Sequence, residues 1–421
     1  MVKKKNKKTF TLATIILIIF FLATKSVHAT ELNLNSDKYI LYNLDENTIL
    51  DKKDENKEAS VASLTKIMTT IVAIENIKDF DKTVIITKEM FKDIAWDVSV
   101  AGFKVNDEVT YNDLLYGAIL PSGADAVNAL ALSVSDSYEE FVKLMNKKVN
   151  ELKLKHTHFS NVTGLYSEEN YSSAYDMAQI LKYALKNKKF KKIFETKKYT
   201  FTTGKTVKST IEHYNSRIGS KDISYITGGK TGYINASGYC LATTAKIDNV
   251  NYLLITLNAE NTKTAPHIED AITTYEYYSK NYGNKIIVDK NDEVVTLKAK
   301  SSREKQINIK ANTIIEKYLK NDFDKNKIKY NYDGVKKVSY FTKKGTKLGT
   351  VEVVYNDIVL DKFDLIYSQA LTFSLFSFIW NNLLLIIFLF FVLFILFRIV
   401  QLSYKKRKRR KNRRRQMKYH N

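Results

Sequence analysis

Three short segments of this 421-residue chain carry side chains whose types and spacing suit nucleophilic catalysis by a serine. Ser63 and Lys66 lie three residues apart in EASVASLTKIMTTIVAIE, residues 58–75. Ser122 follows a proline directly, and a Lys-Thr-Gly triplet occupies residues 230–232 beside two further glycines. A serine hydroxyl is a poor nucleophile until a base accepts its proton, so the lysine nearest to a serine is the first candidate base.

The segment around Ser63 explains how a lysine could act as a base. Its apolar residues recur at helical spacing, which predicts an amphipathic or buried helix. Side chains three residues apart share one helix face, so Ser63 and Lys66 are expected to be neighbours. Burial and the positive end of a helix both disfavour a charged ammonium. Lys66 is therefore predicted to hold a neutral amine that accepts the Ser63 proton.

Each segment also has a simpler structural interpretation. Ser63 could cap a helix, although Lys66 replaces the Glu or Gln of a capping box and Ser60 could cap as well. Lys66 could extend its ammonium to solvent, Ser122 could cap the helix after the proline, and Lys-Thr-Gly could form a turn. Ser-x-x-Lys alone is weak evidence because the chain contains it three times. The three segments in this order favour catalysis.

The elements that must position these residues can be outlined from the pattern. One or two helices are predicted from Ser122, and an amphipathic helix is predicted over residues 171–186. From Tyr225 the glycine-punctuated sequence predicts two strands with a tight connection, and residues 268–283 predict a closing helix. Residues 284–368 alternate short β-rich runs, which predicts a small, separate β domain.

The net charge of +22 is concentrated at the two ends of the chain. Residues 1–29 contain six lysines and residues 398–421 contain twelve Lys or Arg, and neither segment contains an acid. The segment between them, residues 30–397, carries only +4. This distribution argues against nucleic acid as a partner of the body of the protein.

Both ends predict export and membrane anchoring. Residues 1–29 have the basic start, apolar run and small-residue ending of a signal peptide, with cleavage expected after Ala29; an uncleaved anchor is the alternative. Residues 373–400 predict a transmembrane helix, and the basic residues 401–421 predict a cytoplasmic tail. The protein is thus expected in the cell membrane as a single-pass protein with its body outside. Cys240, the sole cysteine, is expected to be a buried, inert thiol.

Several motifs in order resemble the serine-type D-alanyl-D-alanine carboxypeptidases, the low-molecular-weight penicillin-binding proteins of peptidase family S11. The resemblance covers nearly the whole exported body and rests on ASLTKIMT, VNDEVTYNDLLYGAILPSGADAVNALA, HFSNVTGLYSEENYSSAYDMAQI and GGKTGYINASGYCLATTAK. It implies an α/β (α+β) fold. A β-lactamase/transpeptidase-like catalytic domain, residues 30–283, would have a central antiparallel sheet flanked by helices, and a small β-rich domain, residues 284–368, would follow.

The resemblance also implies a role for each site residue. Ser63 would attack the penultimate D-Ala carbonyl of a peptidoglycan stem pentapeptide, Lys66 would accept its proton, and Ser122 would relay a proton to the leaving D-alanine. Substrate binding would fall to the Lys-Thr-Gly strand: Lys230, Thr231, Gly232 and Tyr233. Lys230 and Thr231 would bind the terminal carboxylate, and the backbone N–H groups of Ser63 and Tyr233 would form the oxyanion hole. β-Lactams would acylate Ser63, no cofactor or metal is implied, and the role would lie in cell-wall maturation and cell shape.

One residue departs from the family pattern. The middle motif is usually Ser-x-Asn, whereas this chain has Ser122-Gly123-Ala124. Alanine cannot form the hydrogen bond of the usual amide. Asp125 or Asn128 is a hypothetical replacement.

Three other functions compete with this interpretation of the sequence. A β-lactamase would need a carboxylate to activate the deacylating water; Glu168 and Glu169 lie in a plausible region, but Glu-x-x-Leu-Asn is absent. A non-catalytic wall-binding protein is possible if Ala124 marks lost chemistry. A metallopeptidase is disfavoured because the histidines, including His156 and His158, form no His-Glu-x-x-His motif.

Overall fold

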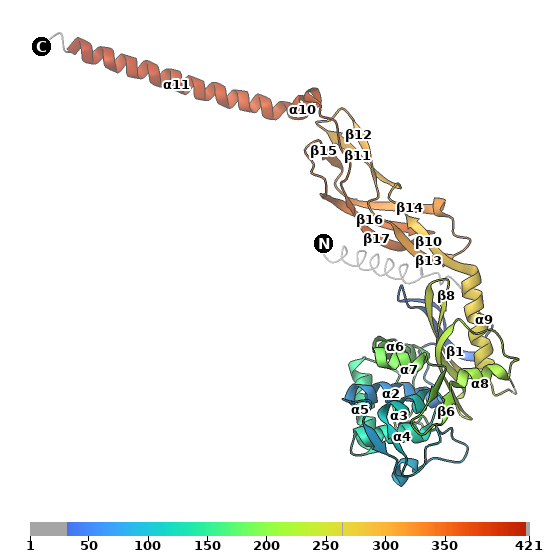
Figure 1. Ribbon diagram of the computed structural model, residues 1–421. Helices are drawn as coiled ribbons and strands as arrows, with labels where there is room; N and C mark the ends of the chain where they lie inside the picture. Colours follow the sequence, from blue (N-terminus) through green and yellow to red (C-terminus); the bar gives the residue numbers. More distant parts are fainter. Residues whose placement is uncertain (1–31, 263, 418–421) are drawn as a thin grey trace, which may run out of the picture. The chain divides into compact units, whose positions relative to one another are not determined.

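The computed structural model describes residues 32–262 and 264–417, which form two compact units (Figure 1). The first unit ends at Lys280 and the second begins at Asn281, and each is described by itself. The predicted signal peptide, residues 1–29, lies outside the described residues.

The first unit is built on a five-stranded, fully antiparallel sheet in the order β2-β1-β9-β8-β7. The strands are β1 (Ser36–Asn43), β2 (Thr48–Lys53), β7 (Ile226–Ile234), β8 (Gly238–Ile247) and β9 (Val250–Ala259). Three strands, not the predicted two, follow Tyr225. The extra reversal is made by Asp248 and Asn249, whose φ angles of 49° and 65° suit a tight hairpin turn.

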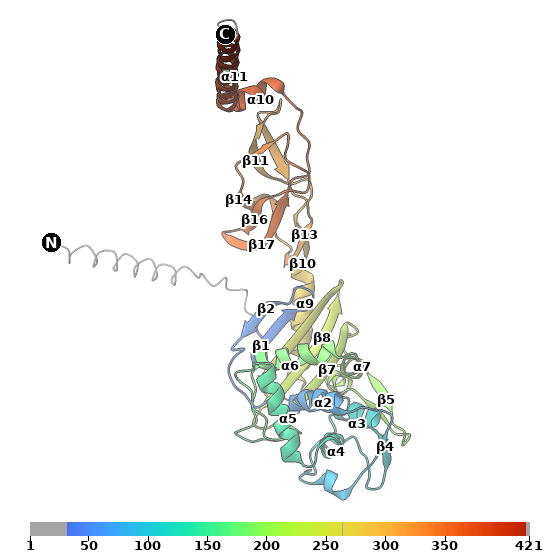
Figure 2. The same cartoon turned by 90° about the vertical axis from the view of Figure 1, so that its left-hand side faces the viewer.

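Helices cover both faces of this sheet (Figure 2). On one face lie α2 (Thr65–Asn76), α3 (Tyr111–Ile119), α4 (Ala124–Val134), α5 (Tyr138–Glu151), α6 (Ala174–Lys186) and α7 (Lys188–Phe194). The other face carries α9 (Pro266–Asn281), whose Tyr275 hydroxyl lies 2.7 Å from Thr243 Oγ1 of β8. Remaining short elements are η1 (Ala62–Leu64), β3 (Thr83–Ile85), η2 (Lys88–Phe91), β4 (Glu108–Thr110), β5 (Lys198–Thr200), β6 (Thr206–Lys208) and α8 (Thr210–Ser216).

Helix α2 lies at the centre of this unit. Its residues from Thr65 to Ile74 are all buried, so the helix is buried all round and is not amphipathic. It packs against α4 and α6, and full burial of a side chain such as Ile67 contributes roughly 2 kcal/mol to folding. A reactive side chain on α2 is therefore held by the best-packed part of the core.

The second unit is rich in β structure and has its own core. Its strands are β10 (Tyr282–Val288), β11 (Glu293–Lys300), β12 (Gln306–Lys310), β13 (Ile315–Lys320), β14 (Ile328–Gly334), β15 (Lys337–Ser339), β16 (Lys347–Tyr355) and β17 (Ile358–Ile366), with a 3₁₀ turn, η3 (Lys325–Lys327), before β14. Ile309, Val351, Val353 and Leu365 are fully buried in this core. The predicted fold class, a central antiparallel sheet with helices, a β-rich region and a C-terminal apolar helix, is confirmed.

The C-terminal helix differs from the prediction at both ends. In place of one helix over residues 373–400, the chain forms α10 (Leu375–Asn381) and α11 (Leu383–Met417). Asn382 separates them because its backbone leaves the helical region, at φ −117° and ψ 14°. By length and composition, α11 can cross a membrane over Leu383–Asn412. It continues without a break into the basic residues that were expected to form a separate tail.

Candidate active site

Ser63 lies in η1, two residues before Thr65, the first residue of the helix that carries Lys66. Lys66 Nζ lies 2.7 Å from Ser63 Oγ and donates a hydrogen bond to the Thr163 carbonyl at 2.8 Å. The N-terminal cap of α2 is Leu64, without a side-chain capping bond, so Ser63 is not a helix cap. The predicted pairing of Ser63 with Lys66 on one face is present.

The Lys66 side chain is enclosed by protein. Its exposed fraction is 1%, so the ammonium does not extend to solvent. Burial lowers the pKa of Lys66 from 10.5 to about 7, against the opposing charge of Asp125. Near neutral pH a large share of the molecules therefore carries a free amine 2.7 Å from the serine hydroxyl.

Ser122 lies across the site on a strained turn before α4. Its φ of +63° is in the left-handed region, which costs an L-residue roughly 1–2 kcal/mol. The cap of α4 is Gly123, so Ser122 does not cap this helix. Instead, its hydroxyl oxygen accepts a hydrogen bond from Lys230 Nζ at 2.7 Å, which fixes the oxygen and leaves its proton free to point elsewhere.

Lys230 and Thr231 lie on β7, which is an edge strand of the five-stranded sheet. Lys230 Nζ also donates to the Thr231 carbonyl at 2.6 Å, and Thr231 Oγ1 donates to Thr210 Oγ1 at 2.8 Å. Burial, together with the nearby Lys66 amine, holds the pKa of Lys230 well below its usual value. The Lys-Thr-Gly triplet is therefore part of a regular strand and not a turn.

Two glycines allow the backbone to approach Ser63 closely. A Cβ at Gly232 would lie 3.0 Å from the Ser63 backbone nitrogen, so β7 passes directly beside the serine. A Cβ at Gly164 would lie 2.0 Å from the Ala62 carbonyl oxygen, and Gly164 has a φ of +87°. Only glycine fits this second position without displacing one of the two segments.

Asn161 organises the loop that brings Gly164 and Thr163 to Ser63. Its side-chain oxygen accepts hydrogen bonds from the backbone N–H groups of Thr163, Gly164 and Leu165, at 3.2, 2.7 and 3.2 Å. The Thr163 carbonyl is thereby aimed at Lys66. Sequence reasoning included this loop in the HFSNVTGL segment but assigned no role to Asn161; an asparagine shortly before a glycine was the available signal for such a turn.

These groups surround a cavity of about 550 Å³. Six of the seven predicted site residues line it: Ser63, Lys66, Ser122, Thr231, Gly232 and Tyr233. The seventh, Lys230, contacts the cavity through Ser122. The structure thus brings together side chains that are up to 170 positions apart in the sequence numbering, from Ser63 to Tyr233.

The hypothesis that Asp125 or Asn128 replaces the usual amide is not supported. Asp125 accepts hydrogen bonds from the backbone N–H groups of three consecutive residues, 101–103, at 2.7, 2.8 and 3.1 Å. Asn128 donates to the Lys92 carbonyl at 3.3 Å and lines, together with Ala124, a second cavity of about 450 Å³. Neither side chain lines the cavity that contains Ser63.

The carboxylates and histidines of the alternative functions, Glu168, Glu169, His156 and His158, do not line the Ser63 cavity. Within the described chain, the one acidic residue that lines this cavity is the exposed Asp97. Over residues 32–262 and 264–417, no group of three or more His, Cys, Asp or Glu residues is arranged to hold a metal ion. Cys240 is buried, and burial raises the pKa of its thiol to about 11.

Solved structures that share this fold include the following two. Penicillin binding protein 5 from Haemophilus influenzae superimposes with a TM-score of 0.60 at 23% sequence identity, covering 81% of this chain and 99% of that one. The Streptomyces K15 DD-transpeptidase superimposes with a TM-score of 0.53 at 29% identity, covering 59% of this chain and 98% of that one.

The sequence comparisons identify the family. Residues 23–261 match the D-alanyl-D-alanine carboxypeptidase family. The D-alanyl-D-alanine carboxypeptidase DacF of Bacillus subtilis is 30% identical over 359 residues, which span 82% of this chain and 89% of that protein. The chain belongs to the D-alanyl-D-alanine carboxypeptidase family of serine-type peptidases, as its motifs predicted.

Proposed function

We propose that this protein is a membrane-anchored serine D-alanyl-D-alanine carboxypeptidase that removes the terminal D-alanine from peptidoglycan stem pentapeptides during cell-wall maturation. The observation that supports this most strongly is the 2.7 Å separation of a buried lysine amine and a serine hydroxyl within a cavity also lined by Ser122 and Thr231. Family membership supplies the substrate class.

In the first step, Ser63 Oγ attacks the carbonyl carbon of the penultimate D-Ala while Lys66 Nζ accepts the hydroxyl proton. Negative charge develops on the carbonyl oxygen. The backbone N–H groups of Ser63 and Tyr233 are proposed to bind this oxygen, and each such donor contributes about 3 kcal/mol in other hydrolases. The close passage of Gly232 beside the Ser63 nitrogen supports this arrangement.

In the second step, the C–N bond breaks and D-alanine leaves as an amine. Ser122 donates its hydroxyl proton to the leaving nitrogen and regains a proton from the protonated Lys66. The Lys230 hydrogen bond holds the Ser122 oxygen in place during this transfer. Water then attacks the ester carbonyl while Lys66 Nζ accepts one of its protons, and the bond to Ser63 Oγ breaks as Lys66 returns that proton to the serine oxygen. The shortened peptide is released with a free carboxyl group.

Lys230 and Thr231 are proposed to bind the terminal carboxylate of the substrate. In the free site, burial and, to a smaller extent, the positive charge of protonated Lys66 lower the pKa of Lys230 and disfavour its charged form. A bound substrate carboxylate raises the pKa of Lys230 again, because a negative charge nearby favours the ammonium form. The carboxylate carried by β-lactam antibiotics would bind in the same way, so these compounds would acylate Ser63.

Helix α11 is proposed to anchor the protein in the cell membrane as a single span. Arginines and lysines over residues 405–415 follow the apolar stretch, and such clusters remain on the cytoplasmic side. The first unit and the β-rich part of the second unit would then lie outside the cytoplasm, where peptidoglycan is found. Residues 1–29 are proposed to be the signal peptide that exports them.

Mass spectrometry of a pentapeptide muropeptide incubated with the protein tests this function. Wild-type protein is expected to release one D-alanine, and Ser63→Ala is expected to release none. Binding without D-alanine release or labelling of Ser63 would instead identify a non-catalytic wall-binding protein. Rapid turnover of penicillin, in place of a long-lived acyl-enzyme, would identify a β-lactamase.

A further inference from the structure

Large apolar side chains are exposed at one end of the second unit, beside the start of α11. They come from the loop between β15 and β16, from the segment before α10, and from α10 itself. We call the following six residues the apolar rim: Tyr340, Phe341, Phe373, Leu375, Phe376 and Trp380. Their exposed fractions run from 39% for Phe373 to 78% for Phe376. Soluble surfaces rarely gather so many exposed aromatic rings, so such a group indicates a binding surface.

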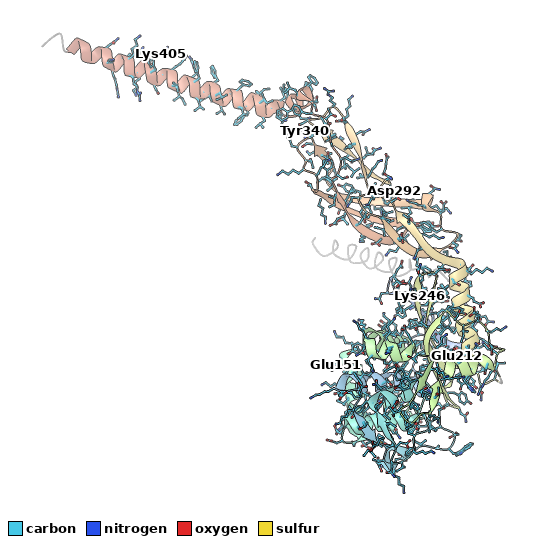
Figure 3. The ribbon with its side chains drawn as sticks, viewed as in Figure 1. Glu151, Glu212, Lys246, Asp292, Tyr340 and Lys405 are labelled. Carbon is cyan, nitrogen blue, oxygen red and sulfur yellow. The ribbon has the colours of Figure 1, made fainter. Side chains whose placement is uncertain are left out.

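The rim is one packed structure although its residues are distant in sequence. The Phe373 ring lies 5.2 Å from the Tyr340 ring and 6.3 Å from the Phe341 ring, measured between centroids. Phe341 also contacts Phe378 of α10, at 6.0 Å. Figure 3 shows Tyr340 beside α10, on the part of the unit from which α11 extends. The loop and the helix therefore present their apolar side chains together.

Backbone hydrogen bonds fix both parts of the rim. In the loop, the Phe341 N–H donates to Ser339 Oγ at 3.2 Å, and the Gly345 N–H donates to the Tyr367 carbonyl at 2.8 Å. In the segment before α10, the Arg303 N–H donates to the Thr372 carbonyl at 2.9 Å. The exposure of the aromatic rings is thus built into a folded frame and does not result from a loose loop.

Positive charge surrounds the loop part of the rim. Residues 336–347 contain five lysines and no acid, and four of these lysines are exposed without an ion pair among the described residues: Lys336, Lys337, Lys343 and Lys344. The fifth, Lys347, pairs with Asp364 at 2.8 Å. Aromatic rings next to lysines match the boundary of a lipid bilayer, where rings lie at headgroup depth and ammonium groups contact anionic headgroups.

The position of the rim beside α11 indicates that its binding partner is the lipid membrane. Helix α10 ends at Asn381 and α11 begins at Leu383, so one residue separates α10, which carries three of the rim residues, from the proposed membrane span. We propose that the apolar rim inserts into the headgroup layer on the extracytoplasmic side of the cell membrane. This proposal rests on the proposed membrane anchoring by α11. The β15–β16 loop then provides a second membrane contact beside α11, and it holds the second unit against the lipid surface.

Single-tryptophan reporters in the full-length protein test this contact. Trp96→Phe and Trp380→Phe remove the two native tryptophans. Onto this background Phe341→Trp places a reporter in the loop, and Phe390→Trp places one in α11. Ile358→Trp is the matched control, because Ile358 is half exposed and lies at the end of the β16–β17 hairpin opposite to Lys347. Each protein is reconstituted into vesicles of phosphatidylcholine and phosphatidylglycerol whose acyl chains carry bromine close to the headgroups.

We expect the reporters at positions 341 and 390 to lose about half of their emission to bromine and the reporter at 358 to lose almost none. Quenching at 390 without quenching at 341 would overturn the membrane contact of the loop and leave the anchor intact. Loss of quenching at both positions would overturn the anchor as well. A reporter at 341 that is shielded from aqueous iodide but not quenched by bromine would show that protein, such as a second copy, covers the rim, and would also overturn the proposal.

Discussion

Replacing Lys66 by methionine removes an amine that the fold keeps neutral at a cost in stability. Lys66 is 1% exposed, and burial lowers its pKa from 10.5 to about 7. At pH 7 the unfolded chain binds a proton that the folded chain binds only in part, which destabilises the folded state by about 4 kcal/mol. At pH 9 proton binding stabilises the unfolded chain less, because the pH is closer to the pKa of a free lysine, and the penalty falls to about 2 kcal/mol. Below pH 7 both states bind the proton, so the penalty stays constant.

Methionine has a similar length and no charge, so Lys66→Met relieves this penalty. It also leaves the Thr163 carbonyl without its hydrogen-bond donor, which costs roughly 1–3 kcal/mol at any pH. The pH-dependent part is therefore the decisive quantity. The free energy of unfolding of the variant minus that of wild type should decrease by about 2 kcal/mol between pH 7 and pH 9.

Pulse proteolysis in urea, applied to the full-length protein in detergent, measures this difference at each pH. Lys147→Met is the control because Lys147 is exposed on α5 and stays in water in both states. Its difference from wild type should not change with pH. If the difference in unfolding free energy between Lys66→Met and wild type is also independent of pH, the claim that Lys66 is a neutral amine in the folded protein is refuted. The same variant should fail to form a penicillin adduct.

Three further substitutions probe the rest of the site. Ser122→Ala should slow pentapeptide cleavage by about 10²–10³-fold and slow penicillin acylation less, because the leaving amine loses its proton donor; equal losses would contradict this role. Gly164→Ala should reduce penicillin labelling because the added Cβ would lie 2.0 Å from the Ala62 carbonyl oxygen, whereas Gly204→Ala, with a similar φ of +82° and nothing within 4 Å, should retain it. Lys230→Met should lower kcat/KM by about 10–100-fold for a substrate with a free terminal carboxylate. A carboxamide-terminated substrate should lose much less, and an equal loss on both would exclude carboxylate binding.

The part of the site formed by residues close in sequence could be predicted. The contacts between residues that are distant in sequence could not. The Ser63–Lys66 pair follows from helical periodicity, since three-residue spacing fixes a shared face. The hydrogen bond from Lys230 to Ser122 depends on where β7 lies relative to the turn before α4, and no local pattern encodes that distance. The left-handed backbone of Ser122 was equally hidden, because serine does not favour it.

Two misjudged elements show the same limit. The chain after Tyr225 forms three strands because an Asp-Asn pair makes a hairpin turn that lacks the usual glycine. The predicted transmembrane helix is interrupted at Asn382, the second of two consecutive asparagines, and the prediction counted this pair among a few polar interruptions of an otherwise apolar stretch. Asn161 has no catalytic chemistry of its own, and its importance appears only through the three backbone N–H groups that it binds.

The pH dependence of penicillin acylation at Ser63 tests most directly whether Lys66 deprotonates this serine. The second-order rate constant is measured by intact-protein mass spectrometry, with Ser63→Ala as the control that forms no adduct. Because the pKa of Lys66 is about 7, the rate should rise roughly tenfold per pH unit below this value and level off above it. A rate that is flat or that falls between about pH 5 and about pH 7, where the Lys66 amine loses its proton, would contradict the mechanism.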